Sequence, residues 1–80
     1  MLTCGMIKAG RDLVGWTQAD LAARAGVSVP TIQRLEDPLR GPLRASGATL
    51  VKLVDAFGTA GVRFDLTPER LTIVWTRAIR

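Results

Sequence analysis

The sequence predicts a small, mostly α-helical domain that ends in a β-hairpin or a single strand. Two short amphipathic helices meet at Gly26, and apolar side chains recur at i, i+3, i+4 and i+7 spacing over residues 50–57. After these helical patterns, apolar and charged residues alternate over residues 62–66, as in a half-buried strand. The 80 residues suit one domain with one small core, and 48% apolar residues argue against disorder.

The first helix is expected over residues 3–14. Ile7, Gly10, Leu13 and Val14 recur at helical spacing, which indicates one core-facing side. Glycine inside a helix costs about 1 kcal/mol relative to alanine. Packing against other elements must therefore stabilise this helix, and Gly10 permits one of them to approach closely.

The next two helices follow from their capping residues. Thr17 is a favourable N-cap for a helix over residues 18–25, which Gly26 ends. Ser28 caps a further helix, and Pro38 stops it. Two helices around a short glycine-containing turn form a helix-turn-helix, whose second helix enters the major groove of DNA. Double-stranded DNA is therefore the expected partner.

A fourth helix is expected to start at its cap Ser46 and to end at Gly58. Its apolar residues keep helical spacing, which indicates that it is part of the core scaffold. We therefore expect a helix-turn-helix domain over residues 1–60 and a C-terminal extension over residues 61–80.

The extension is predicted to form a hairpin. Residues 71–76 are rich in β-branched and aromatic side chains, and residues 67–70 supply a turn after the strand at 62–66. An isolated two-stranded hairpin is marginal in water and has unpaired edges. Pairing with a second copy would solve both problems, so we expect a homodimer. The residues expected to contact the second copy, or another partner, are Val62, Phe64, Leu71, Ile73 and Trp75.

A helix is the alternative conformation for the extension. With Thr67 as N-cap and Pro68 in the first turn, this helix would gather its apolar residues on one face. In either conformation the apolar side chains offer a surface to a partner or pack onto the helical core. On the helix, those residues are Leu71, Trp75, Ala78 and Ile79.

Residues 16–36, WTQADLAARAGVSVPTIQRLE, resemble the Cro/C1-type, or XRE-type, helix-turn-helix repressors. The resemblance extends over about the first three quarters of the chain. It implies a domain of four or five helices. The residues that carry it are Gln18, Leu21, Ala22, Gly26, Ser28, Ile32, Leu35 and Glu36.

The resemblance also implies which residues meet DNA. Gln18 would touch a phosphate at the start of the second helix, and Ser28, Thr31 and Arg34 would contact DNA from the third. Arg34 suits the reading of guanine, because a guanidinium can donate two hydrogen bonds to that base. The alternative is an ordinary solvated helix face, with Gln18 an ordinary first-turn residue.

The third helix departs from the repressor pattern at two positions. Val29 and Pro30 stand where such repressors often have polar base-reading residues, and neither side chain can hydrogen-bond a base edge. Val29 could still touch a thymine methyl group, whereas Gln33 is a weaker candidate than Arg34 for reading a base. We therefore expect modest sequence specificity or readout of DNA shape.

The chain is basic, with a formal net charge of +4 from 11 basic and 7 acidic residues. This charge favours contact with a polyanion but is well short of that of an architectural DNA binder. Arg40 and Arg44 lie in a Pro/Gly-rich segment just after the third helix, where they could hold the phosphate backbone. The alternative is a solvated connector, whose charge Glu36 and Asp37 partly cancel.

The scarcity of cysteine and the absence of histidine argue against most kinds of metal site and catalytic site. Cys4 is the only cysteine and the chain has no histidine, so we expect no metal, no cofactor, no disulfide and no catalytic pair. An enzyme is therefore not expected. The sequence contains neither a run of about 18 apolar residues nor a signal-peptide pattern, so we expect no membrane contact and a cytoplasmic location.

Two functional classes fit these patterns. The first is a small dimeric transcriptional regulator that binds operator DNA through the third helix. The second is a protein-binding regulator, such as an antiactivator or antitoxin-like module, that presents Val29, Pro30 and the apolar extension to another protein. The apolar start of the third helix and the moderate charge favour the second class, whereas Arg34 and the arginine-containing loop favour the first.

Overall fold

The computed structural model describes residues 4–37, 39, 47–67 and 69–76. This part of the chain forms four helices followed by a two-stranded antiparallel sheet. The fold is mostly α-helical with a C-terminal hairpin, as the sequence predicted. The elements are α1 (Cys4–Val14), α2 (Gln18–Ala25), α3 (Val29–Leu35), α4 (Gly47–Thr59), β1 (Val62–Leu66) and β2 (Leu71–Trp75).

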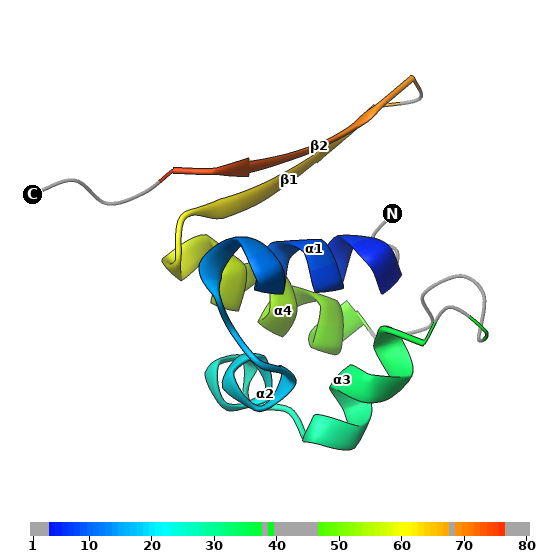
Figure 1. The fold of residues 1–80 in the computed structure, drawn as a ribbon, viewed down its shortest axis with the longest axis vertical. Coiled ribbons are helices and arrows are strands. Elements are labelled where there is room, and N and C mark those ends of the chain that lie inside the picture. The colour runs from blue at the N-terminus through cyan, green and yellow to red at the C-terminus, as the bar shows by residue number, and fades with distance from the viewer. Residues whose placement is uncertain (1–3, 38, 40–46, 68, 77–80) are drawn as a thin grey trace, which may run out of the picture.

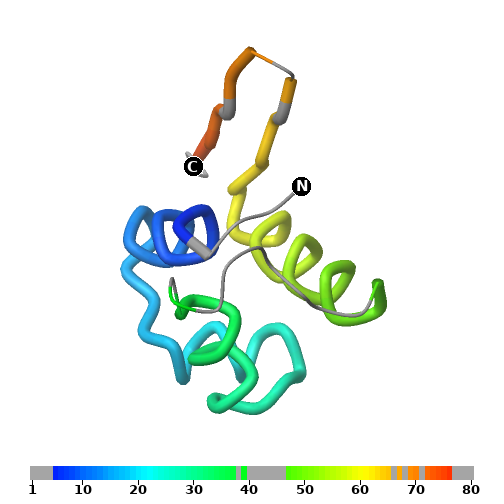
Figure 2. Tube along the Cα trace, turned by 90° about the vertical axis from the view of Figure 1, so that its right-hand side faces the viewer, coloured from blue at the N-terminus to red at the C-terminus, as the bar shows by residue number. Residues whose placement is uncertain are grey.

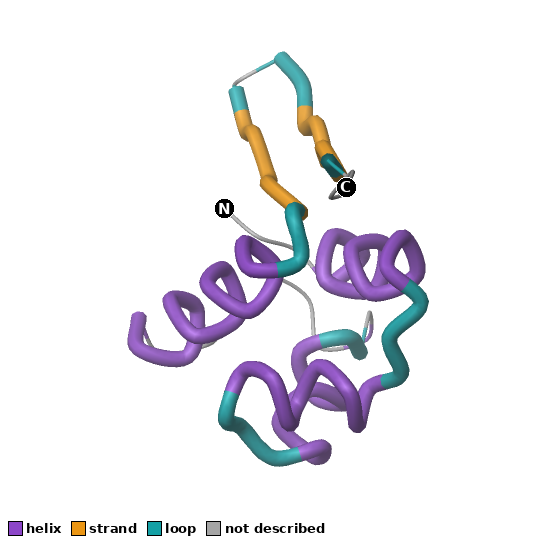
Figure 3. Tube along the Cα trace, turned by 90° about the vertical axis from the view of Figure 1, so that its left-hand side faces the viewer, coloured by secondary structure: helices purple, strands orange, loops and turns teal. Residues whose placement is uncertain are grey.

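The elements lie in three layers (Figure 1). α1 and α4 form the middle layer, with the hairpin on one side of it and α2 and α3 on the other. The views from the two sides show the same order (Figure 2 and Figure 3). The hairpin and the helix-turn-helix unit are therefore separated by the middle layer. Within the described residues, no helix is long and apolar enough to cross a membrane.

The core receives a large buried side chain from every helix. Phe57 of α4 joins this core to the hairpin, because its ring stacks on Trp16 with centroids 5.7 Å apart and meets Phe64 of β1 edge-on at 5.3 Å. These aromatic contacts hold the hairpin on the middle layer. The large side chains that are at most 1% exposed are Ile7, Leu21, Ile32, Leu53 and Phe57.

The buried face of α1 differs from the predicted one at a single position. Ile7 and Gly10 are buried and Val14 is half-buried, as expected, but Leu13 is 41% exposed. Arg11 lies on the buried face of α1 and is only 9% exposed. At about 100° per residue, the position four after Ile7 lies about 40° from it, whereas the position six after it lies about 120° away. The prediction for Leu13 was therefore wrong.

α4 extends beyond its predicted end. Gly58 lies within the helix, which ends at Thr59, and the chain then turns at Gly61 with φ +85°. Glycine is required at this turn, because a Cβ on Gly61 would overlap the backbone carbonyl oxygen of Thr76. The predicted N-cap, Ser46, lies outside the described residues.

β1 and β2 pair antiparallel, and the Thr67 N–H closes the turn by donating to the Arg70 carbonyl oxygen at 2.8 Å. This pairing confirms the predicted hairpin and excludes the alternative helix over residues 71–75. Residues 77–80, which that helix would have included, lie outside the described residues. On one face Val62 stands opposite Trp75, Phe64 opposite Ile73 and Leu66 opposite Leu71, and on the other Arg63 stands opposite Val74 and Asp65 opposite Thr72.

Candidate nucleic-acid interface

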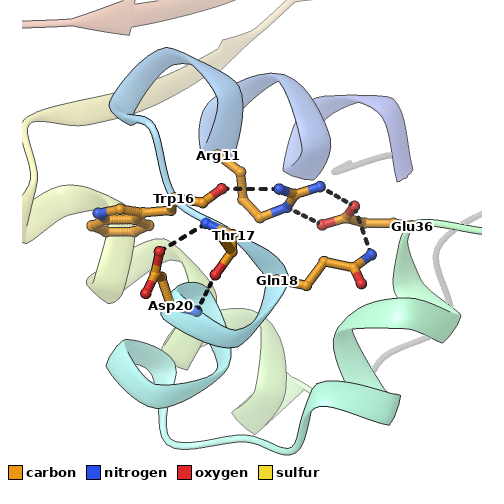
Figure 4. Close-up of polar contacts among 6 residues, drawn as sticks. All are labelled: Arg11, Trp16, Thr17, Gln18, Asp20 and Glu36. Carbon is orange, nitrogen blue, oxygen red and sulfur yellow. Dashed lines mark hydrogen bonds and ion pairs between the residues drawn. The ribbon is translucent and has the colours of Figure 1, made fainter.

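The start of α2 is fixed by a reciprocal pair of hydrogen bonds. The Asp20 N–H donates to Thr17 Oγ1 at 3.0 Å, and the Thr17 N–H donates to Asp20 Oδ2 at 2.9 Å (Figure 4). This capping box satisfies two amide groups at the helix start. The hydrogen bond from the Thr17 N–H also lowers the pKa of Asp20, because it favours the ionised carboxylate.

The turn between α2 and α3 depends on one glycine. Gly26 has φ +71° and ψ +36°, a left-handed conformation that favours glycine, and its N–H donates to the Ala22 carbonyl oxygen. The Val27 N–H donates to the same oxygen at 3.0 Å. Ser28 then begins α3 as its N-cap and accepts from the Thr31 N–H at 3.3 Å. These bonds fix the direction in which α3 leaves α2.

The outer side of α3 carries most of the predicted DNA contacts. Ser28, Gln33 and Arg34 are exposed, and Thr31 is half-buried. Thr31 Oγ1 lies 2.8 Å from Ser28 Oγ and accepts from Arg34 Nη2 at 3.4 Å. The structure therefore places three of these hydroxyl and guanidinium groups within one short network on the helix surface.

The two apolar residues that depart from the repressor pattern lie side by side in the first turn of α3 but differ in exposure. Val29 is half-buried and packs against the core, whereas Pro30 is exposed. Only part of the Val29 side chain is thus open to a thymine methyl group. Pro30 contributes an apolar surface at the beginning of the helix.

A buried ion pair connects α1 to the end of α3. Arg11 Nε donates to Glu36 Oε2 at 2.6 Å and Nη2 donates to Oε1 at 2.7 Å, with side chains only 10% and 5% exposed (Figure 4). Arg11 Nη1 also donates to the Trp16 carbonyl oxygen at 3.0 Å. The Glu36 carboxylate raises the pKa of Arg11, so the guanidinium stays charged despite its burial.

Gln18 belongs to the same polar cluster. Its Nε2 donates to Glu36 Oε1 at 3.3 Å, and the side chain is half-buried. A glutamine amide nitrogen carries two hydrogens, so a second donor is left for another acceptor. The predicted phosphate contact of Gln18 is compatible with this arrangement and stays a prediction.

These helices correspond to a known family. The family model described as helix-turn-helix matches residues 7–62, which run from within α1 to the first residue of β1 and make up more than half of the chain. The chain belongs to the Cro/C1-type helix-turn-helix family. This is a family of DNA-binding regulatory proteins and not of enzymes. A comparison with curated proteins gave no match.

Sequence reasoning missed the ion pair that supports this helix-turn-helix domain. Arg11 lies four residues after Ile7, on the buried face of α1, and a buried cation needs an anionic partner. That placement was the available signal. The partner, Glu36, is 25 residues away and could not be chosen from local spacing.

Two of the predicted phosphate contacts of the helix-turn-helix domain are not placed. Arg40 and Arg44 lie outside the described residues. Before them, the Leu39 N–H donates to Asp37 Oδ1 at 2.9 Å, and Leu39 itself is 94% exposed. The predicted arginine contacts in this segment therefore stay predictions.

The predicted partner residues of the hairpin differ in their exposure. Val62 is 3% exposed and lies in the core, while Phe64 and Ile73 are half-buried and pack against it. Trp75 is 37% exposed, and its Nε1 donates to the Ala60 carbonyl oxygen at 3.2 Å. Leu71 stands at the far end of β2 from Trp75. The inner face of the hairpin thus covers the domain's own core.

Proposed function

We propose that this protein is a transcriptional regulator that binds operator DNA as a homodimer, with α3 in the major groove. The observation that carries the proposal is that Gln33 and Arg34 are exposed on the outer face of α3. The position of this helix is fixed by the turn at Gly26 before it and by the ion pair of Glu36 at its end. Family membership supports the same function.

In this proposal Arg34 reads a guanine. Its Nη2 donates to Thr31 Oγ1 at 3.4 Å, which holds the guanidinium along the outer side of α3. Two nitrogen donors of an arginine match the O6 and N7 acceptors of guanine in the major groove. Gln18 would use its second amide hydrogen on a phosphate, and Arg40 and Arg44 would add phosphate contacts that do not depend on sequence.

The test is a fluorescence-anisotropy titration of the purified protein. One probe is a random-sequence duplex pool and the other is DNA from upstream of its own gene, each at two salt concentrations. Salt-dependent binding with preference for the upstream duplex is the expected result, because phosphate contacts release counterions and base contacts add specificity. Equal affinity for both probes would contradict operator recognition.

A second candidate function is a regulator that binds another protein. Pro30 is exposed beside the half-buried Val29, so the first turn of α3 offers an apolar surface in place of polar base-reading groups. The absence of DNA binding at micromolar protein and low salt would favour this function. In that case Pro30→Glu should weaken capture of the protein partner while leaving the free energy of unfolding nearly unchanged.

A further inference from the structure

The outward face of α3 is centred on Pro30. Successive residues of a helix are about 100° apart, so Gln33 and Arg34 lie about 60° and 40° from Pro30, one on each side. All three residues are exposed. Ile32 and Leu35, which lie more than about 130° from Pro30, are 0% and 7% exposed. The residue that points most directly away from the core is therefore a proline.

Pro30 presents a hydrocarbon ring and no hydrogen-bond donor. It lies in the first turn of α3, and its nitrogen carries no hydrogen. The neighbouring guanidinium leaves this ring uncovered. Arg34 Nη2 donates to Thr31 Oγ1 at 3.4 Å, and Thr31 lies farther round the helix than Arg34, on the side away from Pro30. The outward face of α3 thus has an apolar centre beside a positive charge.

One group on the base edges of the major groove matches such a ring. Base pairs present hydrogen-bonding atoms there, and the C5 methyl group of thymine is the apolar group among them. A ring placed against an amino or carbonyl group would remove its water without replacing the hydrogen bond, which costs free energy. Against a methyl group, both surfaces lose water favourably. 5-Methylcytosine carries the same C5 methyl group.

We propose that α3 reads the C5 methyl group of a pyrimidine through Pro30, close to a guanine that Arg34 binds. This inference rests on the proposed function, because it names the DNA feature that the same helix selects. Pro30 and Arg34 are four residues apart, so their Cβ atoms are about 5–6 Å from each other. Successive base pairs are about 3.4 Å apart. The methylated pyrimidine therefore lies within about two base pairs of the guanine.

Deoxyuridine tests the proposal on the parent chain. This nucleotide pairs with adenine as thymidine does, but its base lacks the C5 methyl group. Two versions of the upstream duplex are compared by fluorescence anisotropy, one with thymine and one with uracil at every thymine position. Burial of one methyl group changes an affinity about fourfold, so the Kd of the deoxyuridine duplex should be at least about fourfold higher. Single deoxyuridine substitutions then locate the methyl group that α3 contacts.

The variant Pro30→Ser tests the same contact from the side of the protein. It removes the hydrocarbon ring, so it should bind the thymine duplex more weakly than the parent and should lose little more on the deoxyuridine duplex. Comparison of both proteins on both duplexes isolates the contact, as in a double-mutant cycle. The matched control is Val51→Ser, which removes a 59% exposed apolar side chain from α4 in the middle layer (Figure 1). Its affinity and its methyl dependence should match those of the parent.

A further pair of duplexes distinguishes the two sources of the methyl group. At the located position, thymine is replaced by cytosine or by 5-methylcytosine, each paired with guanine. The 5-methylcytosine duplex should bind about fourfold more tightly than the cytosine duplex. A methyl effect in both comparisons shows that either pyrimidine is read, whereas an effect with thymine alone assigns the contact to thymine.

The outcomes separate this inference from operator binding itself. Equal affinity of the parent for the thymine and deoxyuridine duplexes would overturn the inference and leave operator binding in place. A parent-like methyl dependence in Pro30→Ser would also overturn it, because another group would then cover the methyl group. Binding to neither duplex at micromolar protein and low salt would remove operator binding together with this inference, and would favour the protein-binding function.

Discussion

Arg11 and Glu36 form a two-point ion pair between the middle of α1 and the C-cap of α3, with Nε–Oε2 and Nη2–Oε1 distances of 2.6 and 2.7 Å. The pair is buried, so the loss of hydration offsets much of its attraction. Its structural effect is to hold the end of α3 against α1. Because α3 presents the proposed DNA contacts, the ion pair connects core stability to the position of the interface.

Removal of one member of this pair should be strongly destabilising. Arg11→Met leaves the Glu36 carboxylate buried, and among the described residues its remaining side-chain donor is Gln18, at 3.3 Å. The expected loss in the free energy of unfolding is about 3–5 kcal/mol, the usual cost of an uncompensated buried charge. Urea denaturation followed by circular dichroism measures it.

The exposed pair of β1 provides the control for that experiment. Arg63→Met breaks an ion pair whose side chains are 72% and 49% exposed, so the loss should stay below about 1 kcal/mol. The double variant Arg11→Met/Glu36→Leu should lose less than Arg11→Met alone, since no buried charge remains. Equal losses for Arg11→Met and Arg63→Met would contradict the role assigned to burial.

Arg34→Ala should weaken binding to the preferred duplex by about 1–3 kcal/mol and relax the preference at one base position. Arg34 is exposed, so the urea midpoint should be unchanged. Lys52→Ala is the matched control, because it removes one exposed positive charge from α4 in the middle layer. Parent-like affinity of Arg34→Ala on the preferred duplex would remove Arg34 from the interface.

The helices and the hairpin could be predicted because local residues determine them. Thr17 and Ser28 are N-caps, and Gly26 adopts the left-handed conformation that ends α2. Each of these features acts within about four residues of the chain. The alternation of apolar and charged residues over 62–66 is equally local, and it predicted β1 correctly.

The polar support of the interface could not be predicted in the same way. Glu36 contacts Arg11 across 25 residues, and this contact exists only after α1 and α3 pack together. The exposure of Leu13 has a different origin, since its position six residues after Ile7 lies about 120° from the buried face of α1. Residue spacing within one helix identifies a buried face, whereas its partners depend on tertiary packing.

The capping box of α2 should make stability depend on pH in the acidic range. The folded pKa of Asp20 is lowered from its ordinary value of 3.8. The ionised carboxylate therefore makes its full contribution to the free energy of unfolding above pH 3.8, and this contribution is lost as the pH falls through the lower, folded pKa. The difference in the free energy of unfolding between the parent and Asp20→Asn should therefore shrink between neutral pH and strongly acidic pH. Urea denaturation at a series of pH values measures it.

The partner of Asp20 in the capping box gives a complementary control. Thr17→Ala removes the acceptor for the Asp20 N–H and should cost about 1 kcal/mol at neutral pH. That variant keeps the carboxylate, but the hydrogen-bonded cap is incomplete, so the pH dependence should be weaker than in the parent. A parent-like pH dependence in Asp20→Asn would assign the effect to another carboxylate.

Two helical glycines should respond oppositely to substitution by alanine. A Cβ at Gly10 would lie 3.0 Å from both Phe57 Cε1 and Phe64 Cζ, whereas a Cβ at Gly58 meets nothing within 4 Å. Phe57 is 1% exposed and is held by Trp16 on one side, so its ring has little freedom to move away. Gly10→Ala should therefore be destabilising, although alanine favours the helix by about 1 kcal/mol.

Gly58→Ala isolates the helix preference from the packing effect. It should raise the free energy of unfolding by up to about 1 kcal/mol, because the alanine is accommodated in open space. Gly10→Ala should lower it by about 1–3 kcal/mol, the usual cost of overpacking. The near-ultraviolet circular dichroism of Gly10→Ala should also change, since Phe57 contacts Trp16 and Phe64. If both substitutions stabilise the protein equally, Phe57 and Phe64 do not hold the close positions against Gly10 that the 3.0 Å distances indicate.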